Sequence, residues 1–287
     1  MPKSILASLT GLAGDRSAIE TAIAAARLDG GHVTALYARI DVVEAAAIAE
    51  ITFPQRGGGS STLHKVSLEQ TERSQAARAA FTAASETHHL QLLEAPAEAT
   101  GVSMSWRETK SFFNETLEDA RYHELVVMAR EAEISNDRIK LVLTQCGRPL
   151  LIPPPKPLPV LGRNIAIAWK PGTAAARAVT AAMPLLCKAS EVFILTASVK
   201  PADDGEDKAS AERLARELAW SGIKAKIAVD HSTSRSEGQR LEDLSYGCDA
   251  DLLVVGGYGH SRAREMIFGG VTEHMIKGCS IPVFMAH

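Results

Sequence analysis

The sequence predicts an α/β protein made of two open, doubly wound parallel-sheet domains. Three observations lead to this fold class. Strand-like and helix-like segments alternate, the alternation occurs twice, and a proline-rich segment separates the two series. Strands that alternate with helices of about ten to fifteen residues form right-handed crossovers and a parallel sheet. The length of 287 residues suits two such domains of about 140 residues each.

The composition agrees with this fold class and argues against others. Hydrophobic residues make up 46% of the chain but aromatic residues only 5%, as expected where aliphatic helices cover a buried parallel sheet. The formal net charge is −3 and there is no basic run, which argues against a nucleic-acid partner. No segment reaches the roughly 18–20 apolar residues of a membrane helix, and residues 1–11 read as a strand rather than a signal peptide. We therefore expect a cytoplasmic protein without a membrane partner.

The proline-rich segment at residues 153–159 (PPPKPLP), followed by Gly162, marks the expected domain boundary. Proline lacks an amide donor and has a fixed φ, so this stretch continues neither a central strand nor a helix. It is typical of a short, stiff, extended linker. The sequence thus predicts an N-terminal domain at residues 1–154, a linker at 155–162 and a C-terminal domain at 163–287.

Each domain is expected to contain five strands. Strand-like runs occur at residues 5–9, 32–39, 102–106, 124–128 and 149–152, and again at 163–169, 191–198, 225–229, 251–257 and 281–286. Helical patterns occur at 16–28, 63–88, 111–121, 173–188, 209–221, 237–246 and 265–277, and Thr173 is placed to cap the fourth of these. Residues 41–62 form an insertion, either a lid over a pocket near Thr10 or a loop without function.

The segment most suited to ligand chemistry is residues 254–272 (VVGGYGHSRAREMIFGGVT), whose glycines have the spacing G-x2-G-x9-G-G. A strand that ends in glycines presents backbone amides, and a following helix adds its unpaired N–H groups and its positive dipole end. Such a loop can hold a phosphate without a lysine. Alternatively, the glycines only form turns and allow a helix and a strand to pack closely. The pattern is neither a Walker A loop nor a Rossmann fingerprint.

Residues 251–287 resemble the C-terminal signature of the universal stress protein family. The nucleotide-binding members share G-x2-G-x9-G followed by Ser or Thr, Val, and a Pro-Val strand. In this chain Gly256, Gly259, Gly269, Val271 and the pair Pro282-Val283 match. The resemblance implies a tandem protein with an adenine-nucleotide α-hydrolase-like fold and strand order 3-2-1-4-5 in each domain.

In that family the last strands of two domains pair to form a two-fold dimer. Here the runs PLLI and PVFMA occur in one chain, so the resemblance implies an intramolecular pseudo-dimer. The short linker favours this pairing because it keeps the effective concentration high. A further homodimer of two chains is compatible with the pattern but does not follow from it.

The resemblance also implies a site for ATP or AMP with Mg²⁺. Gly256 and Gly259 would line the ribose and phosphate loop, and Gly269, Gly270 and Val271 would offer amides to the phosphates. His260 and Arg262 contact either phosphate or solvent. The complete expected set is Gly256, Gly259, His260, Arg262, Gly269, Gly270, Val271, Thr272, Ala168 and Lys170.

Two positions depart from the family pattern. Gly270 stands where the family has Ser or Thr, although Thr272 follows two residues later. At the end of the first strand, where the family often has Asp, this chain has Ala168-Trp169-Lys170. Lys170 either reaches a phosphate or is a solvated loop residue, and Trp169 either covers a base or plugs the pocket.

The N-terminal domain departs further. Its loop at residues 129–134 has no glycine, is shorter than its counterpart and carries two carboxylates, so we expect this site to be lost. No catalytic acid–base pair or metal site is expected: the cysteines form no CxxC pair, and adjacent residues such as His88 and His89 face different ways on a helix.

The sequence therefore predicts a stress-response protein that binds an adenine nucleotide in its C-terminal domain and acts as a sensor or regulator. The alternative is a nucleotide-free scaffold whose glycine loop is structural. Enzymatic activity is not expected beyond slow ATP hydrolysis.

Overall fold

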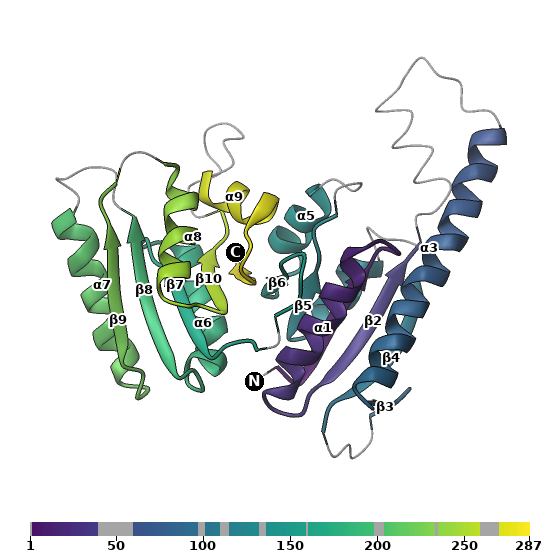
Figure 1. Ribbon diagram of the computed structural model, residues 1–287, viewed down its shortest axis with the longest axis horizontal. Coiled ribbons are helices and arrows are strands. Elements are labelled where there is room, and N and C mark those ends of the chain that lie inside the picture. The colour runs from purple at the N-terminus through teal and green to yellow at the C-terminus, as the bar shows by residue number, and fades with distance from the viewer. Residues whose placement is uncertain are drawn as a thin grey trace.

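The computed structural model describes residues 2–39, 60–96, 101–109, 115–131, 136–158, 160–197, 204–232, 235–258 and 270–287. Within these residues the strands form a single 11-stranded sheet with the order β3-β4-β2-β1-β5-β6-β11-β10-β7-β8-β9. Figure 1 shows the sheet running through both halves of the molecule, with helices on its two faces.

The N-terminal half contains β1 to β6 and the helices between them. Its elements are β1 Ser4–Leu9, α1 Gly14–Arg27, β2 His32–Ala38, α3 Ser60–Thr87, β3 Gln91–Leu92, β4 Ser103–Thr109, α4 Leu117–Tyr122, β5 Leu125–Met128, α5 Asp137–Gln145 and β6 Leu150–Ile152. The C-terminal half repeats the pattern. Its elements are β7 Asn164–Ala168, α6 Thr173–Leu186, β8 Glu191–Ala197, α7 Asp204–Ala219, β9 Ala225–Asp230, α8 Glu237–Gly247, β10 Leu252–Gly256, α9 Gly270–Gly278 and β11 Val283–Ala286.

The strand order confirms the expected topology. When the two-residue β3 is set aside, each half has the order 3-2-1-4-5, and its five strands are parallel. The two halves meet where β6 pairs with β11, and this pairing is antiparallel. Ile152, Leu151 and Leu150 lie opposite Val283, Phe284 and Met285. The PLLI and PVFMA runs therefore join the halves into one sheet.

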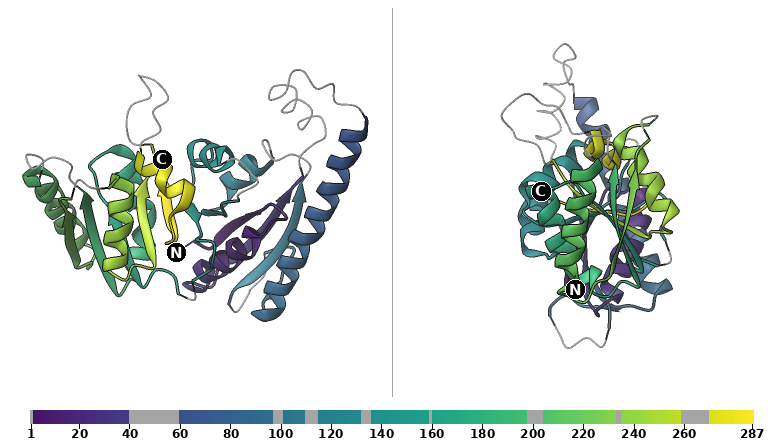
Figure 2. Two further views of the ribbon diagram at one scale, coloured as in Figure 1. Left: turned by 45° about the horizontal axis from the view of Figure 1, so that its top comes forward. Right: turned by 90° about the vertical axis from the view of Figure 1, so that its left-hand side faces the viewer.

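Two hydrophobic clusters cover the two faces of the sheet, and each cluster extends across both halves. Helices α1, α3, α6 and α7 supply the cluster on one face. Helices α4, α5, α8 and α9 supply the cluster on the other, and Figure 2 shows the two helical layers from the side. The strand-like runs are thus buried on both faces, which explains their nearly continuous apolar sequence.

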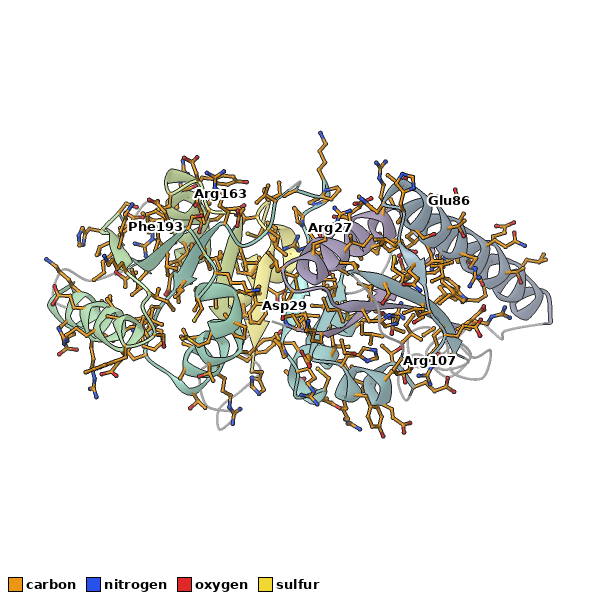
Figure 3. All side chains as sticks on the ribbon, turned by 90° about the horizontal axis from the view of Figure 1, so that it is seen from below. Arg27, Asp29, Glu86, Arg107, Arg163 and Phe193 are labelled. Carbon is orange, nitrogen blue, oxygen red and sulfur yellow. The ribbon has the colours of Figure 1, made fainter. Side chains whose placement is uncertain are left out.

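The two halves also touch near the N-terminal ends of their strands, on the far side of the sheet from the strand ends that carry the loops after β5 and β10. Lys188, just after α6, donates from its ammonium group to the Leu28 carbonyl at 2.8 Å and lies 3.2 Å from Asp29. Figure 3 shows Asp29 in this position between the halves, seen from below. Because these side chains are exposed, the ion pair adds little to stability.

Three local features differ from the sequence prediction. Helix α5 and strand β3 were not expected; α5 has only nine residues and β3 only two, too few for a clear periodicity. Thr173 is the first residue of α6 rather than its cap, and the capping position belongs to Gly172. Among the described residues, no helix is both long and apolar enough to cross a bilayer.

Candidate functional site

A cavity of about 250 Å³ opens at the carboxyl ends of β7 and β10. Its walls come from these two strand ends and from the first turns of α6, α8 and α9. Open parallel sheets bind ligands at this edge, where the strand order reverses. Six of the ten expected site residues line the cavity: Ala168, Lys170, Gly256, Gly270, Val271 and Thr272. The other four, Gly259, His260, Arg262 and Gly269, lie outside the described residues.

Two helices begin at this cavity. Helix α6 starts behind Gly172, and no side chain of the described residues caps it. Helix α9 starts at Gly270, which also lines the cavity. The first N–H groups of a helix have no partner within the helix, and its N-terminus carries a partial positive charge. The cavity therefore has a local preference for an anion.

Glu237, at the start of α8, was not anticipated at this site. Its Oε1 atom lies 3.9 Å from Lys170 Nζ, and the Lys170 side chain is 62% exposed. A pair at this distance and exposure is weak and leaves the ammonium group free to move. No sequence signal connects these two residues, which are far apart in the chain.

Gly256, the first expected cradle residue, has a clear packing role. A Cβ atom added at Gly256 would lie 2.4 Å from the Ala175 backbone nitrogen and 2.7 Å from the Ala174 carbonyl carbon. The end of β10 therefore touches the backbone of α6, which only glycine permits. A Cβ at Gly270 would meet none of the described residues within 4 Å. The packing interpretation thus accounts for Gly256, whereas no described residue packs against the Cβ position of Gly270.

Trp169 and Thr272 are both tied to protein partners at the cavity wall. The Trp169 indole N–H donates to Ser210 Oγ in α7 at 3.0 Å. Thr272 is only 4% exposed, and its hydroxyl accepts from the Tyr258 backbone N–H at 3.3 Å. Trp169 thereby forms a wall of the cavity, and Thr272 holds the turn after β10 against α9.

Helices α8 and α9, whose first turns line the cavity, are held together by polar and close contacts. Glu242 accepts from Ser280 N at 2.8 Å and lies 2.7 Å from His274 Nε2. Burial alone would raise the pKa of Glu242, but the hydrogen bonds from Ser280 and His274 outweigh it and hold that pKa below its usual value. A Cβ at Gly238 would lie 2.6 Å from His274 Cβ, so glycine allows this close contact between helices.

The equivalent place in the N-terminal half is filled by the protein itself. The pairing of β1 with β5 has the same register as the pairing of β7 with β10. Ala129, just after β5, is therefore the counterpart of Gly256. Two residues further on, the Glu131 carboxylate accepts from Gly14 N, the first residue of α1, at 3.1 Å, and from the Thr10 hydroxyl at 3.0 Å. The remaining cavity here measures about 20 Å³. A carboxylate thus occupies the anion position of this helix terminus.

A buried acid, Asp15, stabilises the same turn. Asp15 accepts from Thr10 N at 2.7 Å, from the Thr10 hydroxyl at 3.1 Å and from Gly11 N at 2.8 Å. Burial raises the pKa of Asp15 despite these hydrogen bonds and the nearby Arg138 guanidinium. Burial also lowers the pKa of Arg138 to about 10. The glycine-free loop thus contributes Glu131 to a compact polar cluster at the start of α1.

Comparison with known proteins supports the family resemblance. A sequence model described as the universal stress protein family matches residues 163–287. The C-terminal half is a universal stress protein domain. No curated protein sequence matches the chain.

Solved structures extend the fold likeness to the whole chain, including the part before this universal stress protein domain. A universal stress protein from Archaeoglobus fulgidus is 15% identical with a TM-score of 0.62, and the match covers 98% of this chain and 95% of that one. A putative universal stress protein from Pseudomonas aeruginosa is also 15% identical, with a TM-score of 0.58 and coverage of 99% and 93%. At this identity the likeness establishes a shared tandem fold.

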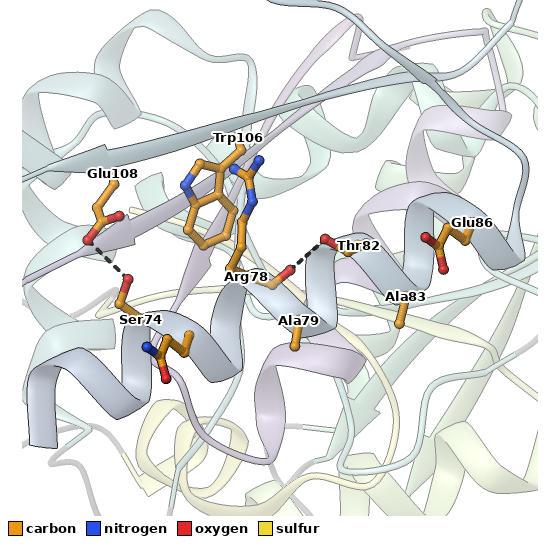
Figure 4. A pocket seen from close by; sticks show the side chains of 9 residues that line it. Ser74, Arg78, Ala79, Thr82, Ala83, Glu86, Trp106 and Glu108 are labelled. Carbon is orange, nitrogen blue, oxygen red and sulfur yellow. Dashed lines mark hydrogen bonds between the residues drawn. The ribbon is translucent and has the colours of Figure 1, made fainter.

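A larger open cavity, of about 710 Å³, lies outside the universal stress protein domain, between α3 and β4. Figure 4 shows Arg78 beside Trp106, and its guanidinium carbon lies 4.9 Å from that ring centre. Ser74 donates to Glu108 at 3.1 Å across the same groove. The Arg78 charge is already paired with the ring, and Glu86 and Glu108 disfavour a phosphate here.

No cluster of metal-ligating side chains occurs in the part of the chain that the structure describes. His88, considered above for its neighbour His89, lies 2.6 Å from Glu20 and 2.8 Å from the Arg27 guanidinium. It therefore joins α1 to the end of α3.

Proposed function

We propose that this chain is a cytoplasmic stress-response protein whose universal stress protein domain binds ATP or AMP, with Mg²⁺, at the cavity between β7 and β10. It would act as a sensor or regulator through a nucleotide-linked change of conformation or partner. The observation that carries the proposal is the convergence of the α6 and α9 N-termini on this cavity. Phosphate is the ligand group best suited to two such helix ends.

The walls also suit the rest of a nucleotide. Ala197, Leu241 and Val255 are apolar, and Trp169 offers part of an aromatic ring. Ligand pockets are mostly apolar with a few placed polar groups, and typically measure roughly 300–1,000 Å³. A cavity of about 250 Å³ accommodates part of a nucleotide, so the remainder would extend through the mouth beside Lys170.

The pairing of β6 with β11 supports the further proposal that the chain is its own pseudo-dimer. One chain would then present one open site and one filled site, whereas a dimer of identical domains would present two open ones.

Thermal unfolding with and without about 1 mM Mg-ATP tests nucleotide binding. A ligand at about 100 times its Kd stabilises the folded state by about 2.7 kcal/mol, which raises the Tm by several degrees. We expect this shift in the wild type. Absence of a shift with both ATP and AMP would favour a nucleotide-free scaffold, for which the packing role of Gly256 already offers a reason.

A matched pair of variants at Gly270 locates the site. Gly270→Glu places a carboxylate at the start of α9, where it would compete with a phosphate for that end of the cavity. Gly270→Gln has nearly the same volume without the charge. We expect Gly270→Glu to abolish the Mg-ATP shift and Gly270→Gln to retain more of it. An equal shift in both variants would place the nucleotide elsewhere.

Slow hydrolysis is a separate hypothesis that the same samples resolve. If the protein only binds nucleotide, ADP does not accumulate above the no-protein background over hours. A rate that increases with protein concentration and is lost in Gly270→Glu would establish an ATPase at this cavity.

A further inference from the structure

Residues 129–131 follow β5 at the centre of the molecule, and two adjacent side chains here point into different halves. Glu131 fills the helix terminus of the N-terminal half, as described above. Arg130 reaches across the β6–β11 joint to α9 of the C-terminal half. The sequence gives no sign of either contact, because the partners are more than 100 residues away.

Arg130 binds the carboxyl end of α9 with two of its guanidinium nitrogens and the Pro153 carbonyl with the third. NH2 donates to the Met275 carbonyl at 2.8 Å and Nε to the Ile276 carbonyl at 2.9 Å. NH1 donates to the Pro153 carbonyl at 3.0 Å. The last carbonyls of a helix lack partners within the helix, and a cation is favoured there. Burial lowers the pKa of Arg130, and the three carbonyl oxygens compensate the loss of water.

The opposite end of the same helix lines the candidate site. Gly270, Val271 and Thr272 form the first turn of α9 and face the cavity. The helix has nine residues and is therefore roughly 14 Å long, so a shift at one end is carried to the other. Arg130 thus holds one end of a short rigid helix whose other end belongs to the cavity.

Helix α5 of the N-terminal half also contacts α9 and the end of β10. Lys140 in α5 lies 3.4 Å from Glu273 in α9. A Cβ at Gly257, after β10, would lie 2.8 Å from Leu143 of α5. Figures 1 and 2 show α5 and α9 side by side at the carboxyl edge of the sheet.

We propose that residues 129–131 couple the two halves: Glu131, seated on α1, fixes the loop that holds Arg130 on α9, and Arg130 is a positioning residue for the C-terminal cavity. Release of Glu131 from Gly14 would loosen Arg130, and α9 would then lose its fixed end. The N-terminal half therefore acts as a support whose state sets the order of α9. The effect on nucleotide rests on the function proposed above, whereas the effect on α9 does not.

Hydrogen exchange of the intact, ligand-free protein tests the coupling. The variants are Arg130→Met, Glu131→Gln and, as a matched control, Arg148→Met. Arg148 also donates from two guanidinium nitrogens to a backbone carbonyl, that of Arg121, but stays within the N-terminal half. Hydrogen bonds from a charged group to the backbone are stronger than those between neutral groups. We therefore expect amides of α9 to exchange roughly tenfold or more faster in Arg130→Met than in the wild type.

Glu131→Gln is expected to speed exchange in two separate segments, the start of α1 and α9, whereas Arg148→Met leaves α9 unchanged. Should Arg130→Met prove too unstable to purify, Arg130→Lys keeps the charge but not the three-way fork and is expected to show the same α9 signature at smaller size. Equal α9 exchange in the Arg130 and Arg148 variants would overturn the proposal. So would a Glu131→Gln effect confined to α1.

The Mg-ATP shift of these variants is then read separately. If the wild type shows a shift, we expect it to decrease in Arg130→Met and to persist in Arg148→Met; an undiminished shift in Arg130→Met would show that Arg130 does not position the cavity. If the wild type shows no shift while the exchange pattern is as expected, the nucleotide proposal fails and the coupling of α9 to the N-terminal half stands.

Discussion

The two halves share one topology, yet the N-terminus of the first helix has different surroundings in each half. In the N-terminal half the start of α1 is bound by the carboxylate of Glu131, and about 20 Å³ remain. In the C-terminal half the start of α6 is uncapped among the described residues and faces about 250 Å³ of space. The fold supplies an anion-binding helix terminus in both cases. Loop residues decide whether that terminus is used by the protein or left for a ligand.

The close contact between the end of the fourth strand and the first helix is also achieved differently in the two halves. In the C-terminal half the strand carries the glycine, Gly256, and the helix carries Ala175. In the N-terminal half the strand end carries Ala129 and the helix carries Gly14, where a Cβ would lie 2.7 Å from Ala129 Cβ. A glycine on either partner suffices for close approach. The position of the glycine is therefore no reliable sign of a ligand site.

The largest expected effect is a loss of stability at Gly256 that does not occur at Gly270. This difference would separate the packing glycine of the motif from the glycine available to a ligand. Gly256→Ala should destabilise the protein by roughly 1–3 kcal/mol, because its methyl group meets the fixed backbone of α6. Gly270→Ala adds the same methyl group where no described residue lies within 4 Å, and it should change stability by less than about 0.5 kcal/mol. Urea unfolding of both variants measures the difference. Similar losses at the two positions would show that Gly270 is also a packing residue.

The polar cluster of the N-terminal half should be of comparable importance. Asp15→Ala leaves the amides of Thr10 and Gly11 without their acceptor, which should cost roughly 1–3 kcal/mol. Asp137→Ala is the control, since Asp137 also stands in the first turn of a helix but its side chain is 78% exposed. We expect its effect to stay within about 0.5 kcal/mol in the same unfolding assay. Equal effects would mean that the cluster stabilises no more than a surface acid does.

Acid should weaken the two halves in different pH ranges. Burial, with a smaller contribution from His123, lowers the pKa of His32, so the unfolded chain takes up this proton more readily than the folded one. The stability from neutral His32 is present above about pH 6.5 and is lost as the pH falls through the lower folded pKa. Glu242 has a lowered pKa, so its contribution is present above about pH 4.3 and is lost only below that value.

Hydrogen exchange at a series of pH values, corrected for intrinsic rates, measures this order. Strands β2 and β4, which His32 joins through Ser103 and Ser105 at 2.9 Å each, should loosen before α8 and α9. The variant His32→Gln should remove the earlier step alone. Simultaneous loosening of both regions would contradict the assignment to separate groups.

The smallest expected effect concerns Lys170. Lys170→Met removes an exposed ion pair with a distance of 3.9 Å, so the unfolding free energy of the ligand-free protein should change by less than about 0.5 kcal/mol. If the lysine contacts phosphate, the Mg-ATP shift should nevertheless decrease. Glu237→Gln removes the competing carboxylate and should leave or increase that shift. Unchanged shifts in both variants would make Lys170 a solvated loop residue.

Much of the fold could be predicted from the sequence because strands that are buried on both faces have nearly continuous apolar sequences. The runs around Ile165–Ala168 and Leu252–Val255 are apolar for this reason, and they pair as expected. The proline-rich segment likewise falls between β6 and β7. Short elements such as α5 were missed because nine residues give little periodicity.

The candidate site was predictable only in part. Strand-end positions such as Ala168 and Gly256 were predicted from the family resemblance and the glycine spacing, and the structure brings both to the cavity. The roles of Glu131 and Arg130 could not be predicted from the sequence. A charged side chain in a loop does not indicate which distant residue it will contact. Gly14 lies 117 residues from Glu131, and such contacts appear only when the chain is folded.

The β6–β11 joint has a practical meaning for anyone who divides the molecule. Cutting the chain between the halves would uncover two short, fully apolar edge strands, β6 and β11, whose backbone groups are paired in the intact chain. An open edge of this kind is a template for another copy. Each isolated half is therefore expected to self-associate, by antiparallel pairing of its own last strand with that of a twin, and to aggregate where that pairing fails. The uncut chain avoids both outcomes because it carries its partner strand with it.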